Sequence, residues 1–125
     1  MLLEALVAIL IFSLGILALV GMQANALREM ADAKYRTDAA FLVNQVIGEM
    51  WVNRTNLATY NYTGGTVPGV LQNWVTDVGN ALPGAAGANN PQVVVAGQTV
   101  TVTVRWQPPN TPVRNHTAVA HIYCC

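Results

Sequence analysis

The stretch MLLEALVAILIFSLGILALVGM, residues 1–22, decides the fold of this 125-residue chain. It carries one charge, Glu4, and otherwise nothing more polar than Ser13. A helix rises about 1.5 Å per residue, so a helix of this length crosses the hydrocarbon core of a bilayer, which is about 30 Å thick. No basic region precedes the stretch and no small-residue cleavage site ends it, which indicates an anchor rather than a secretory signal peptide.

Glu4 is the feature of this stretch that most requires an explanation. A carboxylate at the middle of a membrane helix costs several kcal/mol, about 2.5–3.5 for Asp on insertion scales. Two interpretations stay open on position alone. Glu4 is a functional site inside the apolar run, or it rests near the helix start in the headgroup layer.

Helical periodicity continues beyond the apolar run. Apolar residues recur every three or four positions and form one stripe, which consists of Leu27, Ala31, Tyr35, Ala39, Leu42, Val46 and Met50. No proline precedes Pro68, so we expect one helix from about residue 2 to about Asn53. Gly15 and Gly21 are its weak points, because glycine costs about 1 kcal/mol relative to alanine inside a helix. Gly15 suits the close approach of another helix, and Gly21 suits local unwinding.

Residues 54–91 are expected to form a connecting loop with one short helix. Residues 54–70 are rich in Asn, Thr and Gly, which is typical of loops. Tyr60 and Tyr62 lie in this loop. Contact with a ligand is one interpretation, but loop tyrosines beside Asn and Gly commonly just face solvent, and this is what we expect. Apolar residues at helical spacing follow and predict a short helix, which Pro83 ends. These residues are Leu71, Trp74, Val75, Val78 and Leu82.

Residues 92–125 are expected to form an antiparallel sheet. Gln92–Ala96 and Thr99–Gln107 flank Gly97-Gln98, a connection that suits a hairpin turn with glycine in first position. In the second strand, three valines and Trp106 alternate with threonines and an arginine, so one face is apolar. Thr117–Tyr123 supplies a third strand.

The predicted fold class is therefore α+β. The apolar face of the sheet needs a cover, and the stripe on the long helix provides it. We expect residues 1–22 to be a bare transmembrane or filament-core half of that helix and residues 23–53 to be its amphipathic half. Residues 23–125 would together form a globular head.

Charge is sparse and unevenly placed. Only 10% of the residues are charged, and six basic groups balance six acidic ones. This composition leaves no net electrostatic footprint for nucleic acid. Eight of the charged residues lie between residues 28 and 54, and three follow. The neutral C-terminal part suits a surface that packs against copies of itself or other neutral partners.

No catalytic pattern stands out. His116 and His121 lack a nearby acid or metal-ligand partner, and neither a P-loop nor a GxSxG motif occurs. We therefore expect no enzyme activity, no cofactor and no metal site. Cys124 and Cys125 are the only cysteines. A disulfide between them would be strained, because adjacent Cα atoms lie about 3.8 Å apart. Two thiols, a strained local ring and a cross-link to another chain all stay open.

Taken together, these features resemble type IV pilins. The segment MLLEALVAILIFSLGILALVGMQ is similar to the N-terminal signature of that superfamily. FLVNQVIGEMWVNR (residues 41–54) and VTVTVRW (residues 100–106) resemble PilV-type minor pilins. The resemblance implies that prepilin peptidase cuts a leader just before the apolar run and that the new first residue is N-methylated. Met1 is the candidate for the processed terminus. The signature glutamate normally stands fifth, whereas three residues precede Glu4 here, so two alternatives stay open: the numbering begins one residue late, or the spacing is shorter.

The resemblance also implies a structural role. Glu4 would neutralise the N-terminal ammonium of a neighbouring subunit in the apolar core of a filament. The chain would span the bacterial inner membrane once before the assembly machinery moves it into an extracellular fibre of like or different pilins. A minor pilin for pilus assembly, twitching motility or adhesion is favoured, and a major subunit stays open. The alternatives are a type II secretion pseudopilin and a tip-displayed binding module, in which the loops at 54–70 and 108–116 bind a ligand.

Overall fold

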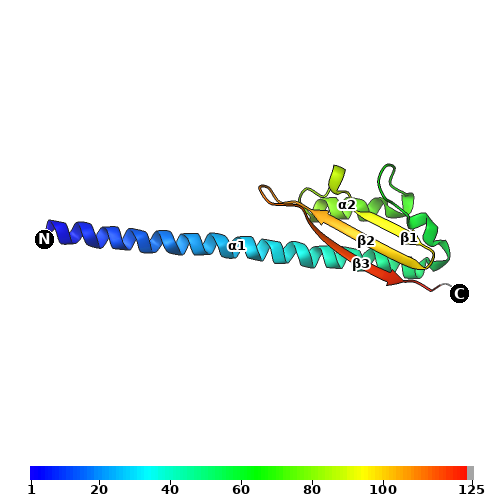
Figure 1. Ribbon diagram of the computed structural model, residues 1–125, viewed down its shortest axis with the longest axis horizontal. Helices are drawn as coiled ribbons and strands as arrows, with labels where there is room; N and C mark the ends of the chain where they lie inside the picture. Colours follow the sequence, from blue (N-terminus) through cyan, green and yellow to red (C-terminus); the bar gives the residue numbers. More distant parts are fainter. Residues whose placement is uncertain (124–125) are drawn as a thin grey trace. The chain divides into compact units, whose positions relative to one another are not determined.

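The computed structural model describes residues 1–123 and confirms an α+β fold, in which a long N-terminal helix packs on a small antiparallel sheet. The chain divides into two compact units, Met1–Lys34 and a second unit that begins at Tyr35. The elements in chain order (Figure 1) are helix α1 (Leu2–Val52), the 3-10 helices η1 (Arg54–Tyr60) and η2 (Gly69–Leu71), helix α2 (Gln72–Ala81), the 3-10 helix η3 (Gly87–Asn89), and strands β1 (Gln92–Ala96), β2 (Thr99–Trp106) and β3 (Arg114–His121).

Helix α1 has the predicted bounds to within one residue and is 51 residues long. Its buried positions follow the predicted helical spacing: Ala39, Leu42, Val43, Val46 and Met50. Leu27 and Ala31 belong to the same predicted stripe but are exposed, and Tyr35 is half-buried. Periodicity therefore located the correct face of the helix, whereas burial begins only where the second unit begins.

The sheet has the strand order β1-β2-β3, and both pairs are antiparallel. Gly97 has φ +64°, which is the left-handed conformation that the predicted first-position glycine turn requires. The alternation in β2 is confirmed, because its valines and Trp106 are all buried. This face joins the buried residues of α1 in one hydrophobic core.

Strand β3 is shifted relative to its predicted position. It begins at Arg114 rather than Thr117 and ends at His121 rather than Tyr123. The register pairs Trp106 with Arg114, so the strand starts as soon as the connection from β2 has reversed direction. The residues Arg114-Asn115-His116 have weak strand propensity, and their pairing comes from β2 rather than from their own sequence.

The prediction that Tyr60 and Tyr62 face solvent is wrong, because each is only 2% exposed. The segment after α1 folds into η1 instead of an open loop, and this turn carries Tyr60 into the core, where its hydroxyl accepts a hydrogen bond from Asn53 Nδ2 at 2.8 Å. Tyr62 forms two backbone hydrogen bonds with Val93 on the outer edge of β1, both 2.7 Å long. Neither tyrosine is available to a ligand.

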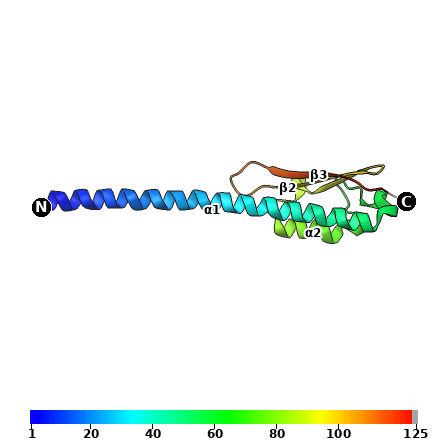
Figure 2. The same ribbon diagram turned by 90° about the horizontal axis from the view of Figure 1, so that it is seen from below.

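Helix α2 lies within one residue of its predicted position at each end and packs against the second half of α1. In the view of Figure 2, the sheet lies on one side of this part of α1 and α2 lies on the other. The buried indole Nε1 of Trp74 donates a hydrogen bond of 2.8 Å to the backbone carbonyl of Leu42. The side chain of Trp74 thus joins the two helices by both packing and a polar contact.

Gly84 holds the connection after α2, and Gly84→Ala is expected to destabilise the second unit by about 2–3 kcal/mol. Gly84 has φ +66°, and a Cβ atom there would lie 2.8 Å from the backbone oxygen of Gln107. Neither the strained φ nor the backbone contact can relax cheaply. Urea unfolding of the full chain in detergent micelles, followed by near-UV circular dichroism, measures the change.

Gly79→Ala is the matched control, because Gly79 lies inside α2 and an added Cβ meets nothing within 4 Å. This variant should be stabilised by about 0.5–1 kcal/mol, as alanine is the better helix former. Equal midpoints for the two variants would contradict the role assigned to Gly84.

Candidate functional site

The apolar run found in the sequence lies in the first unit, entirely on the surface of α1. Every residue from 1 to 31 is exposed. Within the described residues, α1 is the one helix long and apolar enough to cross a membrane, and none of its most apolar window is buried. Large side chains such as Phe12 and Leu17, each 70% exposed, must be covered by lipid or by protein.

Glu4 and Ser13 are the polar side chains in the run, and they differ in how they are satisfied. Ser13 Oγ donates a hydrogen bond of 2.8 Å to the Ile9 carbonyl within the same helix, so it needs no external partner. The Glu4 carboxylate forms no hydrogen bond or ion pair within residues 1–123. It is therefore the polar group of the run that the helix itself does not satisfy.

The apolar part of the Glu4 side chain lines a shallow apolar hollow of about 340 Å³ on the helix surface. The hollow is lined by Leu3, Glu4, Val7, Ala8 and Ile11. Ala8 lies one turn after Glu4, and its small side chain leaves the carboxylate uncovered. A neighbouring helix can thus approach Glu4 from the side and bury the adjoining apolar surface at the same time.

The local environment of Glu4 stabilises its charge only weakly. Glu4 lies in the first turn of α1, where the helix dipole favours a carboxylate by about 0.3–1 kcal/mol. If residues 1–22 fill a bilayer core about 30 Å thick, Glu4 lies about 11 Å from its middle and within about 4 Å of its boundary. A carboxylate at that depth reaches the headgroups, whereas the dry interior of a helix bundle would leave it uncompensated.

The sequence also singled out two glycines, the first residue and two cysteines. Gly15 and Gly21 both lie within continuous α1, and an added Cβ atom at either one meets nothing within 4 Å. Close helix approach at Gly15 and local unwinding at Gly21 stay predictions. The carbonyl of Met1 accepts a hydrogen bond from the amide of Ala5, which begins the helical ladder. Cys124 and Cys125 lie outside the described residues.

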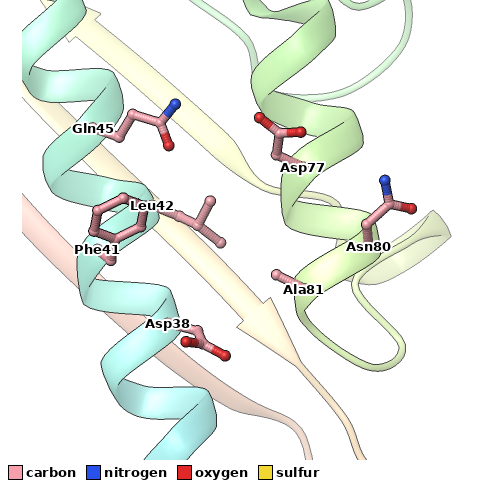
Figure 3. A pocket seen from close by; sticks show the side chains of 7 residues that line it. All are labelled: Asp38, Phe41, Leu42, Gln45, Asp77, Asn80 and Ala81. Carbon is pink, nitrogen blue, oxygen red and sulfur yellow. The ribbon is translucent and has the colours of Figure 1, made fainter.

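Sequence patterns did not locate either of two hollows on the described part of the second unit. The first is a groove of about 530 Å³ between α1 and α2, which contains the carboxylates of Asp38 and Asp77. Figure 3 shows Gln45 and Asp77 extending toward one another from the two helices. The aromatic ring of Phe41, which is 68% exposed, also lines this groove.

The second hollow is a cavity of about 330 Å³ lined by Arg36, Trp106, Arg114, Asn115 and His116. It combines one turn of α1 with the end of β2 and the start of β3. Trp106 and Arg114 are eight positions apart across the β2–β3 connection, and Arg36 lies far away on a helix. No sequence pattern connects these three residues, so only the fold reveals the cluster. Among residues 1–123, no group of three or more His, Cys, Asp or Glu side chains is arranged to hold a metal ion.

In comparisons with known proteins, no family model, no curated protein and no solved structure matches the chain.

Proposed function

We propose that this chain is a structural subunit of a type IV pilus-like filament and that Glu4 joins neighbouring subunits by pairing with an N-terminal ammonium. Before assembly, residues 1–22 hold the chain in the bacterial inner membrane as a single span. Afterwards the same surface is buried among the helices of other pilins in an extracellular fibre. The observation that carries the proposal is a fully exposed apolar helix with one uncovered carboxylate, followed by an α+β unit.

Burial of the apolar surface does not by itself favour the filament over the membrane. Lipid tails are about as apolar as leucine, so helices that leave lipid for protein gain mainly from packing and from polar pairs. Glu4 supplies such a pair. An ammonium and a carboxylate together in a dry core avoid most of the penalty that either would suffer alone, which is several kcal/mol for an unpaired ion.

The pair also specifies register. A carboxylate at one position of an otherwise uniform apolar rod allows a neighbouring helix to slide only until its N-terminus meets Glu4. Displacement by one helical turn, about 5.4 Å, would separate the charges and leave both unpaired. The proposed role of Glu4 is therefore to select one axial position among many that bury similar apolar area.

The second unit fits a subunit that is packed closely with its neighbours. Beyond Thr55 its charged residues are Asp77, Arg105 and Arg114. Copies with few charges on their surfaces can be brought together with little like-charge repulsion. A minor subunit in a fibre of mixed pilins is the role that we favour, on the resemblance of residues 41–54 and 100–106 to PilV-type chains.

Mass spectrometry of intact fibres sheared from the cell surface tests this proposal. We expect the fibres to contain this chain with a methylated amino terminus and with a first residue at or next to Met1. The same spectrum would report whether Cys124 and Cys125 are oxidised. Recovery of the chain from the membrane fraction alone, with none in the fibres, would refute the proposal.

A further inference from the structure

The cavity between α1 and the β2–β3 connection is rich in side-chain hydrogen-bond donors. All five lining residues carry N–H donors, namely Arg36, Trp106, Arg114, Asn115 and His116. No carboxylate is among them. The two guanidiniums are permanently cationic and present five N–H groups each in a planar fork. Such a lining is complementary to a group that has only acceptors and carries negative charge.

Trp106 provides an independent indication that an acceptor belongs here. Its side chain is 1% exposed, and its indole Nε1 is the buried side-chain polar atom that has no hydrogen-bond partner among the described residues. Buried polar groups in native proteins nearly always have a partner, and each exception calls for a specific explanation. The contrast with Trp74 is direct, because the Nε1 of Trp74 donates to the Leu42 carbonyl.

The arginines retain capacity for a ligand even though both take part in other interactions. One guanidinium can serve more than one acceptor, and bidentate pairing with an oxyanion uses two of its five N–H groups. Arg36 comes from α1 and Arg114 from β3, so they enter the cavity from two different elements. A volume of about 330 Å³ admits a phosphoryl or carboxylate group together with part of the molecule that bears it.

From this geometry we infer that the cavity is a binding site for an oxyanion, either a phosphoryl group or a carboxylate of a small molecule. Arg36 and Arg114 hold the charge, and Asn115 and His116 contribute further hydrogen bonds. Trp106 lines the same cavity, and its indole N–H is the buried donor that still lacks an acceptor. The site lies wholly within the second unit, so it is independent of the proposed role of Glu4 in assembly.

The indole signals of the full-length chain in zwitterionic detergent micelles test the site. The chain has three tryptophans, and each reports a different environment in a nitrogen–proton correlation spectrum. Titration with inorganic phosphate, at constant pH and ionic strength, should shift one indole peak saturably with a Kd of about 1 mM. That peak should be absent from the Trp106→Phe variant. The peaks of Trp74 and of Trp51, which is 41% exposed, should stay in place.

Variants of the rim separate a built site from a general effect of charge. Arg114→Gln and, independently, Arg36→Gln should each raise the Kd at least about tenfold, because each removes a charge-assisted pair. Arg54→Gln is the matched control, since Arg54 is an exposed arginine outside the cavity. It should leave the Kd within about twofold of the unmodified chain. Unchanged valine amide signals from β2 would show that each variant is folded.

The class of anion follows from parallel titrations with phosphate, acetate and chloride. A response to phosphate alone identifies a phosphoryl site, and a response to phosphate and acetate identifies a general oxyanion site; both support the inference. An equal response to chloride, an equal loss in Arg54→Gln, or no shift of the Trp106 peak would overturn it.

Discussion

Glu4→Ala is expected to leave the chain in the membrane and to lower its content in surface fibres about 100-fold or more. Removing one member of a buried ion pair costs about 3–5 kcal/mol, because the other charge is left unpaired in a dry interior, and every 1.4 kcal/mol corresponds to about tenfold. Membrane insertion should be unchanged or slightly improved, since the substitution removes a charge from the apolar run. Quantitative immunoblots of membrane and sheared-fibre fractions measure the two effects separately.

Two further variants make the interpretation of that experiment specific. Glu4→Gln retains the size of the side chain and its capacity to accept hydrogen bonds but removes the charge, so it should fail almost as completely as Glu4→Ala. Glu29→Ala removes an exposed acid from the same helix beyond the apolar run, and it should enter fibres normally. Normal fibre content for Glu4→Ala, or an equal defect for Glu29→Ala, would contradict the pairing.

Trp74→Ala is expected to reduce the stability of the second unit by about 3–5 kcal/mol. Trp74 is 2% exposed and joins α2 to α1 through its hydrogen bond to the Leu42 carbonyl. Truncation to alanine removes both the packing and the polar contact. Because a domain of this size is stable by only about 5–15 kcal/mol, the loss is a large fraction of the total. Hydrogen exchange of the β2 amides, measured on the full chain in micelles, reports the change.

Trp74→Phe separates the two contributions, because it keeps an aromatic ring but has no N–H donor. It should cost about 1–2 kcal/mol, mostly from the lost hydrogen bond. Trp51→Ala is the control, since Trp51 is 41% exposed on the same helix that Trp74 contacts, and its cost should be about 1 kcal/mol or less. A cost for Trp51→Ala equal to that of Trp74→Ala would show that Trp74 has no special part in joining α2 to α1.

The elements that could be predicted from sequence are those with a strong local signal. An uninterrupted periodic run fixed the bounds of α1, and strict alternation fixed the buried face of β2. The Gly97-Gln98 turn lies where its glycine predicts. Each of these depends on neighbours in the chain, and neighbours are visible in the sequence.

The features that sequence missed depend on distant partners. Tyr60 and Tyr62 lie in a segment with the composition of a loop, and packing in the hydrophobic core buries them. Strand β3 starts at Arg114 because Trp106 lies opposite, not because Arg114 favours a strand. The donor-lined cavity assembles residues that are about 70 positions apart in the chain, from Arg36 to Trp106, and no spacing rule connects them. Glu4 could be identified from the sequence because a single charge within an apolar run is a local feature.

The hydrogen bonds along the outer side of β1 affect whether another copy of the chain can add a strand to the sheet. Val93 exchanges two hydrogen bonds with Tyr62, and the amide of Val95 donates to Asn61 Oδ1 at 3.1 Å, so these backbone groups are already occupied. An open strand of valines is the kind of template on which amyloid-like stacking begins. At Val93 and Val95 the outer side of β1 therefore offers no free backbone amide to which a valine strand of another copy could add.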